Sequence, residues 1–167
     1  MPRMRYVKCN AWIRMVVLAS LLSLGACSTP YFEPVSPPDA NTSVIYLYRL
    51  KADNPGLQPL RFSYPEIFMD DKSIGFLKYE TRLMVTVTPG KHHFRVTGLT
   101  RDARWEPRDI HLDFTARPGE TQYLKLDVQY NLSEMNLGQP GAKYLIFLTP
   151  VNSNDAVYEI RYTQPSL

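Results

Sequence analysis

Apolar and polar residues alternate along most of the chain after Thr42, and this alternation limits the folds open to it. Ile110, Leu112 and Phe114, for example, are separated by polar residues. Because successive side chains of a strand point to opposite faces, such a segment buries one face and exposes the other. Alternating or short apolar segments also occupy residues 44–49, 66–69, 73–77, 83–88, 93–96, 124–129, 144–148 and 157–162. No window predicts a helix of convincing length, so we expect an all-β fold, a single antiparallel β-sandwich of about eight strands.

Turn signals separate these segments. Asp70, Asp71 and Lys72 lie between two apolar runs and predict a hairpin turn, although glycine is more usual at the position of Asp71. Pro-Gly pairs at 89–90 and 118–119, and the polar residues 152–155, indicate further turns. The chain shows no repeat and no second domain, so residues 43–167 are expected to form one β-sandwich domain.

The N-terminal region has the pattern of an export signal. Residues 15–26 carry no charge and follow four basic residues, and the run is too short for a bilayer-spanning helix, which needs about twenty residues. It ends in Leu24, Gly25, Ala26 and Cys27, which is similar to a bacterial lipobox, the motif in which the cysteine is acylated before cleavage. Residues 1–26 are therefore predicted to be a lipoprotein signal peptide, with Cys27 as the lipid attachment site on the membrane. The alternatives are an ordinary signal peptide and an uncleaved hydrophobic tail.

Residues 27–42 are predicted to link the acylated cysteine to the domain. Four prolines and no alternating pattern follow Cys27, which favours an extended, semi-rigid tether that holds the domain away from the lipid. The alternative is an ordered arm that lies along the domain, with Tyr31 and Phe32 packed against it.

Removal of the signal changes what the composition means. The chain has 19 basic and 16 acidic residues, but four of the bases precede Cys27 and all the acids follow it. The mature chain would then be nearly neutral, so the basic balance does not indicate a nucleic-acid partner. Of the 2 cysteines, Cys9 would be removed and Cys27 acylated. We therefore expect no disulfide, no thiolate metal site and no cofactor.

The order of features resembles a bacterial lipoprotein family that is known only as a domain of unknown function. The segments that carry the resemblance are YLYR at 46–49, IFMDDKSIG at 67–75, VTPGKH at 87–92 and YEI at 158–160. The resemblance implies a small β-domain that faces the periplasm, and it implies no catalytic residues.

Motifs for catalysis or metal binding are weak. His92, His93 and His111 suggest a zinc site, but neighbours in a strand point to opposite faces, so at most one of His92 and His93 can share a site with His111. The spacing places no carboxylate beside them, and the chain has no Gly-x-Ser-x-Gly elbow and no phosphate loop. We expect no catalytic residue and no metal. A concave polar pocket that combines one of these histidines with a carboxylate would instead favour an enzyme.

The segment 98–108 contains the best candidate for a partner-binding surface. Trp105 lies there among Arg101, Arg104 and Arg108, and tryptophan and arginine are enriched at binding hot spots. The alternative is that Trp105 covers the open end of the sandwich. Nearby acidic residues largely neutralise the three arginines, which weakens the case for a partner-binding surface. A second long segment, 131–142, is apolar enough for a partner contact or a packed crossover.

Together these features predict a lipoprotein whose non-enzymatic β-sandwich serves as a binding or envelope-assembly module, with an envelope protein as its partner. One alternative is a secretion-system assembly lipoprotein, and another is a hydrolase that acts on envelope polymers. Ser28 follows the acylated cysteine, where aspartate would be the usual signal for retention in the inner membrane. We therefore expect the anchor in the outer membrane, with the domain on its periplasmic face.

Overall fold

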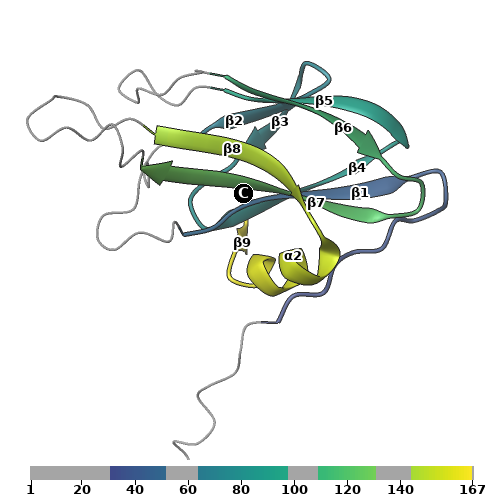
Figure 1. The fold of residues 1–167 in the computed structure, drawn as a ribbon. Coiled ribbons are helices and arrows are strands. Elements are labelled where there is room, and N and C mark those ends of the chain that lie inside the picture. Colours follow the sequence, from purple (N-terminus) through teal and green to yellow (C-terminus); the bar gives the residue numbers. More distant parts are fainter. Residues whose placement is uncertain (1–30, 52–63, 98–108, 131–143, 167) are drawn as a thin grey trace, which may run out of the picture. The chain divides into compact units, whose positions relative to one another are not determined.

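A computed structural model describes residues 31–51, 64–97, 109–130 and 144–166, which form two packed β-sheets (Figure 1). The five-stranded sheet has the order β8 (Tyr144–Val151), β7 (Thr121–Tyr130), β1 (Ser43–Arg49), β4 (Thr81–Val87) and β9 (Gln164–Pro165). The four-stranded sheet has the order β3 (Lys72–Phe76), β2 (Glu66–Met69), β5 (Gly90–Val96) and β6 (Ile110–Ala116). These two sheets confirm the predicted all-β sandwich.

The five-stranded sheet is mixed, which corrects the expectation of a wholly antiparallel fold. β1 pairs antiparallel with β4 but parallel with β7, and the short β9 pairs parallel with β4. The chain crosses from β6 in one sheet to β7 in the other, and backbone bonds from Val44 N to Glu120 O (3.0 Å) and from Gly119 N to Thr42 O (2.8 Å) fix the start of β7 beside the start of β1. Alternation reports which face a residue occupies and not the direction of the neighbouring strand, so the parallel pair was not predictable from it.

β1 is the middle strand of the five-stranded sheet and is buried on both faces. Ile45 and Leu47 point between the sheets and join the main core, which includes Ile67, Phe94 and Leu124. The intervening side chains of β1 point to the outer face of the five-stranded sheet, where they form a second apolar cluster with β7 and the helix; its buried members are Val44, Tyr46, Tyr48, Tyr123, Ala156 and Ile160.

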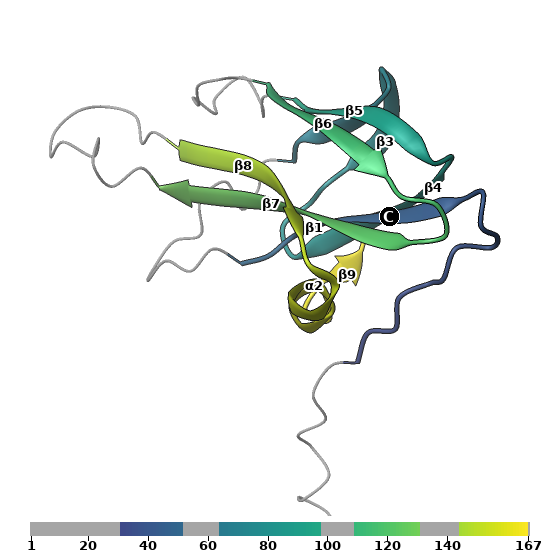
Figure 2. The ribbon, with the colours of Figure 1, turned by 45° about the vertical axis from the view of Figure 1, so that its right-hand side comes forward.

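Residues 157–162 were predicted as a strand, and this prediction is wrong. They belong mainly to helix α2 (Ser153–Ile160), which covers part of the outer face of the five-stranded sheet (Figures 1 and 2). The side chain of Asn152 accepts a hydrogen bond from the backbone N–H of Asp155 at 3.0 Å, so the polar residues that suggested a turn cap the helix. Ala156 and Ile160, four residues apart, then lie on one buried face. Among the described residues no helix has the length and apolar character needed to cross a bilayer.

Polar contacts also join α2 to the sheet. The Tyr48 hydroxyl donates to Glu159 Oε2 at 2.7 Å, and Lys125 Nζ donates to Glu159 Oε1 at 2.9 Å. Burial, with a further contribution from the hydrogen bond to Glu159, raises the pKa of Tyr48 far above its ordinary value, so the phenol remains a donor.

The predicted hairpin between β2 and β3 is present, with a two-residue turn at Asp70 and Asp71. Both residues have positive φ, 49° and 63°. Two consecutive positive φ values are the feature of a type I′ turn, which suits the twist of the strands and usually carries asparagine and glycine. The unusual Asp71 therefore occupies a position where glycine would be unstrained.

Residues 32–42 lie along the domain, as in the ordered-arm alternative. The ring of Phe32 packs edge-on against Tyr46 with centroids 5.3 Å apart, and the Tyr46 hydroxyl accepts from Val35 N at 3.0 Å. Thr121 Oγ1 donates to Val35 O at 2.9 Å. Phe32–Leu167 accordingly forms one compact unit. An extended tether could then include only residues before Phe32.

Candidate functional site

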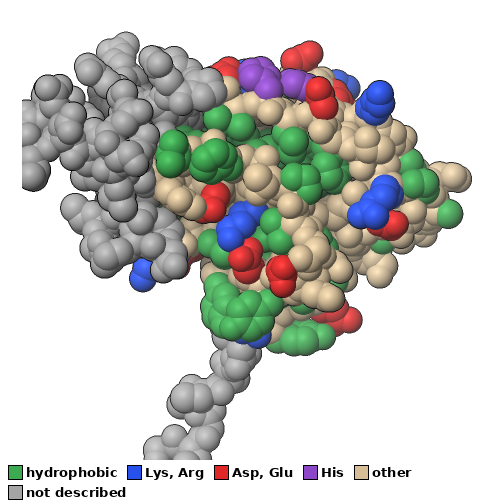
Figure 3. Space-filling model, viewed as in Figure 1, with side chains coloured by type: hydrophobic (Ala, Val, Ile, Leu, Met, Phe, Trp, Pro, Cys, Tyr) green, Lys and Arg blue, Asp and Glu red, His purple; other side chains and the backbone are tan. Residues whose placement is uncertain are grey.

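A network of histidines and aspartates lies at the four-stranded sheet, on the far side of the sandwich from α2. β5 and β6 pair so that His93 is opposite Asp113 and Arg95 is opposite His111. His93 Nδ1 lies 2.8 Å from Asp113 Oδ1, and His93 Nε2 lies 3.0 Å from His111 Nδ1. The centroids of the His93 and His111 rings are 5.2 Å apart. The two strands thus bring together three polar side chains on the outer face, seen at the top of Figure 3, where the histidines are purple.

His92 points to the other face of β5 and makes a separate pair. Its Nδ1 lies 2.7 Å from Asp70 Oδ2 in the β2–β3 turn, and its Nε2 lies 2.8 Å from Thr88 O. Both partners are acceptors, so both ring nitrogens donate only when the ring is protonated. Asp70 also accepts from the backbone N–H of His93 at 2.9 Å through Oδ1.

The contact between His92 and Asp70 shifts the pKa of each group in the direction that favours its charged form. Burial opposes protonation of His92, but the hydrogen bonds to Asp70 and to Thr88 outweigh it, so the pKa of His92 is raised. The hydrogen bonds from His92 and from the backbone of His93 lower the pKa of Asp70. The pair is therefore a charge-assisted bond between the β2–β3 turn and β5.

The expectation that only one of the adjacent histidines could join His111 agrees with this geometry, since His93 does so. The carboxylate of Asp113 was missed. His111 and Asp113 are two residues apart in a strand and so share a face, and this spacing was the signal that could have indicated the cluster. No group of three histidine, cysteine, aspartate or glutamate residues with the arrangement of a metal site occurs in the described ranges.

A hollow of about 400 Å³ adjoins these groups. It is lined by Asp70, Lys91, His92, His93, Asp113, Phe114 and Thr115. It therefore combines histidine with carboxylates, which is the feature that would favour an enzyme. General acid–base catalysis needs a ring nitrogen that can reach a substrate. In this arrangement both nitrogens of His92 and both of His93 have protein partners within 3.0 Å.

The other predicted site residues lie outside the described residues. These are Cys27 and the partner-binding candidates Trp105, Arg101, Arg104 and Arg108, and the segment 131–142 lies outside them as well. Their roles stay predictions.

Comparison with known proteins adds no assignment. No family model matches the chain, and the search of curated proteins gives no match to it. The resemblance to the lipoprotein family of unknown function likewise stays a prediction.

Proposed function

We propose that this chain is a lipoprotein anchored through acylated Cys27 to the outer membrane, and that its β-sandwich is a non-enzymatic module on the periplasmic face that binds an envelope protein. The sequence around Cys27 and the uncharged Ser28 support the anchor and its location. A secretion-system assembly lipoprotein is one form that such a module could take.

The edge of the five-stranded sheet at β8 is the observation that carries the binding role. β8 runs over eight residues and pairs only with β7 among the described strands. An edge strand of this length offers backbone groups to which an extended segment of a partner can add. Leu145 and Phe147 on this strand are 38% and 46% exposed, so a partner strand would also gain apolar contacts.

A photo-crosslinking residue at Phe147 in the anchored protein tests this role in cells. We expect one envelope protein to be captured from position 147 and none from Lys91, an exposed residue of the other sheet. The purified partner should then bind the domain directly, and Phe147→Glu should weaken that binding roughly tenfold or more, as for an aromatic hot spot. Equal capture from both positions, or unchanged affinity of the Phe147 variant, would contradict the proposal.

Two variants test the anchor and its location. Cys27→Ser should abolish labelling by a fatty-acid analogue, and Ser28→Asp should move the protein to fractions that carry inner-membrane markers. Label retained on Cys27→Ser would refute acylation at this residue.

A hydrolase acting on envelope polymers is the second candidate, because histidines and carboxylates, among them His93 and Asp113, line one hollow. Purified domain incubated with envelope polymer should release no soluble fragments if the module only binds. Release by the wild type that His93→Ala abolishes would replace the binding proposal with the enzymatic one.

A further inference from the structure

The first residue of the docked arm is fixed on the same side of the five-stranded sheet as α2. Phe32 packs against the apolar cluster that contains Ala156 and Ile160 of the helix. The Arg82 guanidinium lies 5.0 Å from the centre of the Phe32 ring, and Arg82 Nη1 also donates to Thr163 O just after the helix. Arg82 thus links the start of the arm to the end of α2. Both ribbon views place the arm and α2 on this side (Figures 1 and 2).

The distance from this fixed point to the predicted lipid is short. Phe32 is five residues beyond Cys27, and a fully extended chain of that length spans at most about 18 Å. A domain of this size is roughly 35 Å across. The chain from Cys27 therefore cannot reach the bilayer from the far side of the domain. The side that holds Phe32 must be the nearer one.

That side presents the side-chain types that suit a membrane surface. Tyr158 and Tyr162 are 60% and 48% exposed, and their rings meet edge-on at 6.2 Å. The Arg161 guanidinium lies 3.8 Å and 4.8 Å from the two ring centres. Tyrosine rings favour the headgroup region of a bilayer, and an arginine can bind lipid phosphate.

Two further apolar residues, one on the arm and one on β4, are exposed. Val35 of the arm is 52% exposed. Met84 on β4 is 48% exposed and lies directly opposite Tyr46 across the β1–β4 pair, so it shares the outer face of the sheet. Glu159, the acid at the centre of α2's contact with the sheet, is engaged by Tyr48 and Lys125. We name Val35, Met84, Tyr158, Arg161 and Tyr162 the helix face.

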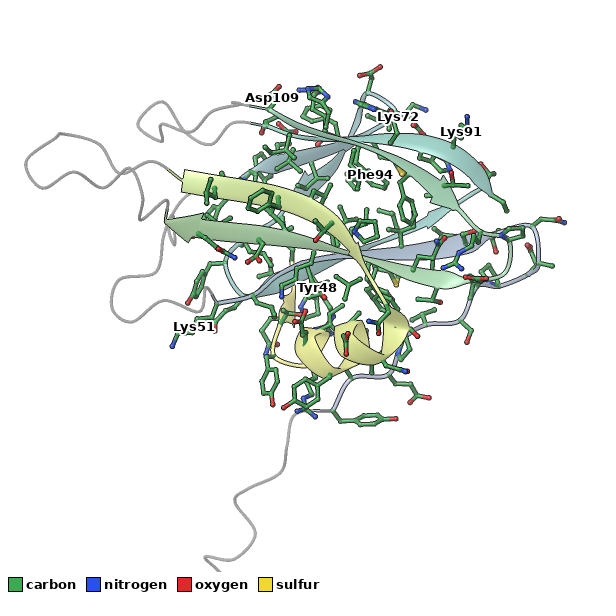
Figure 4. All side chains as sticks on the ribbon, in the orientation of Figure 1. Tyr48, Lys51, Lys72, Lys91, Phe94 and Asp109 are labelled. Atoms are coloured by element: carbon green, nitrogen blue, oxygen red, sulfur yellow. The ribbon has the colours of Figure 1, made fainter. Side chains whose placement is uncertain are left out.

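We infer that, in the anchored protein, the helix face lies against the lipid headgroups. This inference rests on the acylation of Cys27 proposed above. The opposite sheet carries charged side chains, including Lys72 and Lys91, and Figure 4 shows both on the side of the molecule away from α2. The four-stranded sheet and its histidines are then directed away from the membrane.

A fluorescent label attached to an introduced cysteine tests the orientation. The acylated protein contains no other free thiol if Cys9 is removed and Cys27 is blocked, so Tyr158→Cys and Lys91→Cys can each be labelled at one position. Both residues are exposed, so neither change disturbs the core. The two labelled proteins are bound to vesicles of phosphatidylethanolamine and phosphatidylglycerol that contain a lipid with a nitroxide on its headgroup.

We expect the label at position 158 to be quenched roughly twofold or more strongly than the label at 91, because a surface-bound face lies within several ångströms of the headgroups. Phe32→Ala in the same protein should reduce the difference, since it releases the arm and lengthens the free link. Equal quenching at both positions, or stronger quenching at 91, overturns the orientation while leaving the anchor intact. Mass spectrometry of the same preparation shows whether the anchor itself is present. A Cys27 without acyl chains refutes the anchor and the orientation together.

Discussion

The Phe32 ring meets Tyr46 edge-on, with centroids 5.3 Å apart and ring planes at 87°, and Tyr46 in turn stacks on Tyr123 at 5.7 Å. This relationship extends the second apolar cluster beyond the sheet to the arm. Composition alone predicts an extended, semi-rigid tether for this segment, but Phe32 holds its described part to the domain.

Phe32→Ala should lower the free energy of unfolding of the soluble domain by about 1–2 kcal/mol, because it removes an aromatic pair and the contact with Arg82. Urea denaturation of a protein that begins at Ser28 measures the change. Val35→Ala is the matched control, since Val35 is 52% exposed and its hydrogen bonds are made by the backbone. Equal effects of the two variants would show that Phe32 does not fix the arm.

The β2–β3 turn predicts an order of stability for variants of Asp71. Its φ of 63° costs a residue with a Cβ about 1–2 kcal/mol, and aspartate tolerates this region better than alanine does. Thermal unfolding should therefore give Asp71→Gly the highest midpoint and Asp71→Ala the lowest, with the wild type between them. A midpoint for Asp71→Ala at or above that of wild type would argue against the left-handed conformation at this position.

Much of the sandwich follows from sequence because one face of most strands is buried. The alternation at Leu83, Val85 and Val87, and the aspartates of the β2–β3 turn, are local signals that the fold retains. Helix α2 was missed for a local reason as well. Valine, isoleucine and tyrosine favour strands, and eight residues are too few for a helical period to outweigh that preference.

The parts of the site that sequence could not supply depend on pairing between strands. That His93 and His111 can share a face follows from alternation, but their 3.0 Å contact requires the register of β5 and β6. Likewise, Asp70 approaches His92 only because β2 pairs with β5, over a separation of 22 residues. Alternation specifies faces, while register and strand order come from the packing of the whole domain.

Tyr48→Phe should destabilise the domain by about 1–2 kcal/mol, because Glu159 loses a buried donor and, among the described residues, keeps only Lys125 as a side-chain donor. The raised pKa of Tyr48 means that the phenol donates this bond throughout the neutral range. Thermal unfolding followed by circular dichroism measures the loss. Tyr158→Phe is the control, since Tyr158 is 60% exposed on the same helix and should change the midpoint little. A Tyr48→Phe protein as stable as this control would mean that the hydrogen bond contributes nothing net.

The Asp70–His92 pair predicts a window of pH in which it stabilises the fold. The pKa of Asp70 is lowered in the folded protein, so its contribution is present above the ordinary carboxylate pKa of about 3.9 and is lost as pH falls through the folded value. The pKa of His92 is raised, so its contribution is complete below the ordinary value of about 6.5 and is lost as pH rises through the folded value. The pair should therefore stabilise most between about pH 4 and pH 6.5.

Asp70→Asn removes the charge while keeping a residue that accepts the φ of 49°. The difference in melting temperature between wild type and Asp70→Asn should be largest in that window and should shrink on both sides of it. A difference that stays constant from pH 4 to pH 9 would show that the two groups are not coupled as ions.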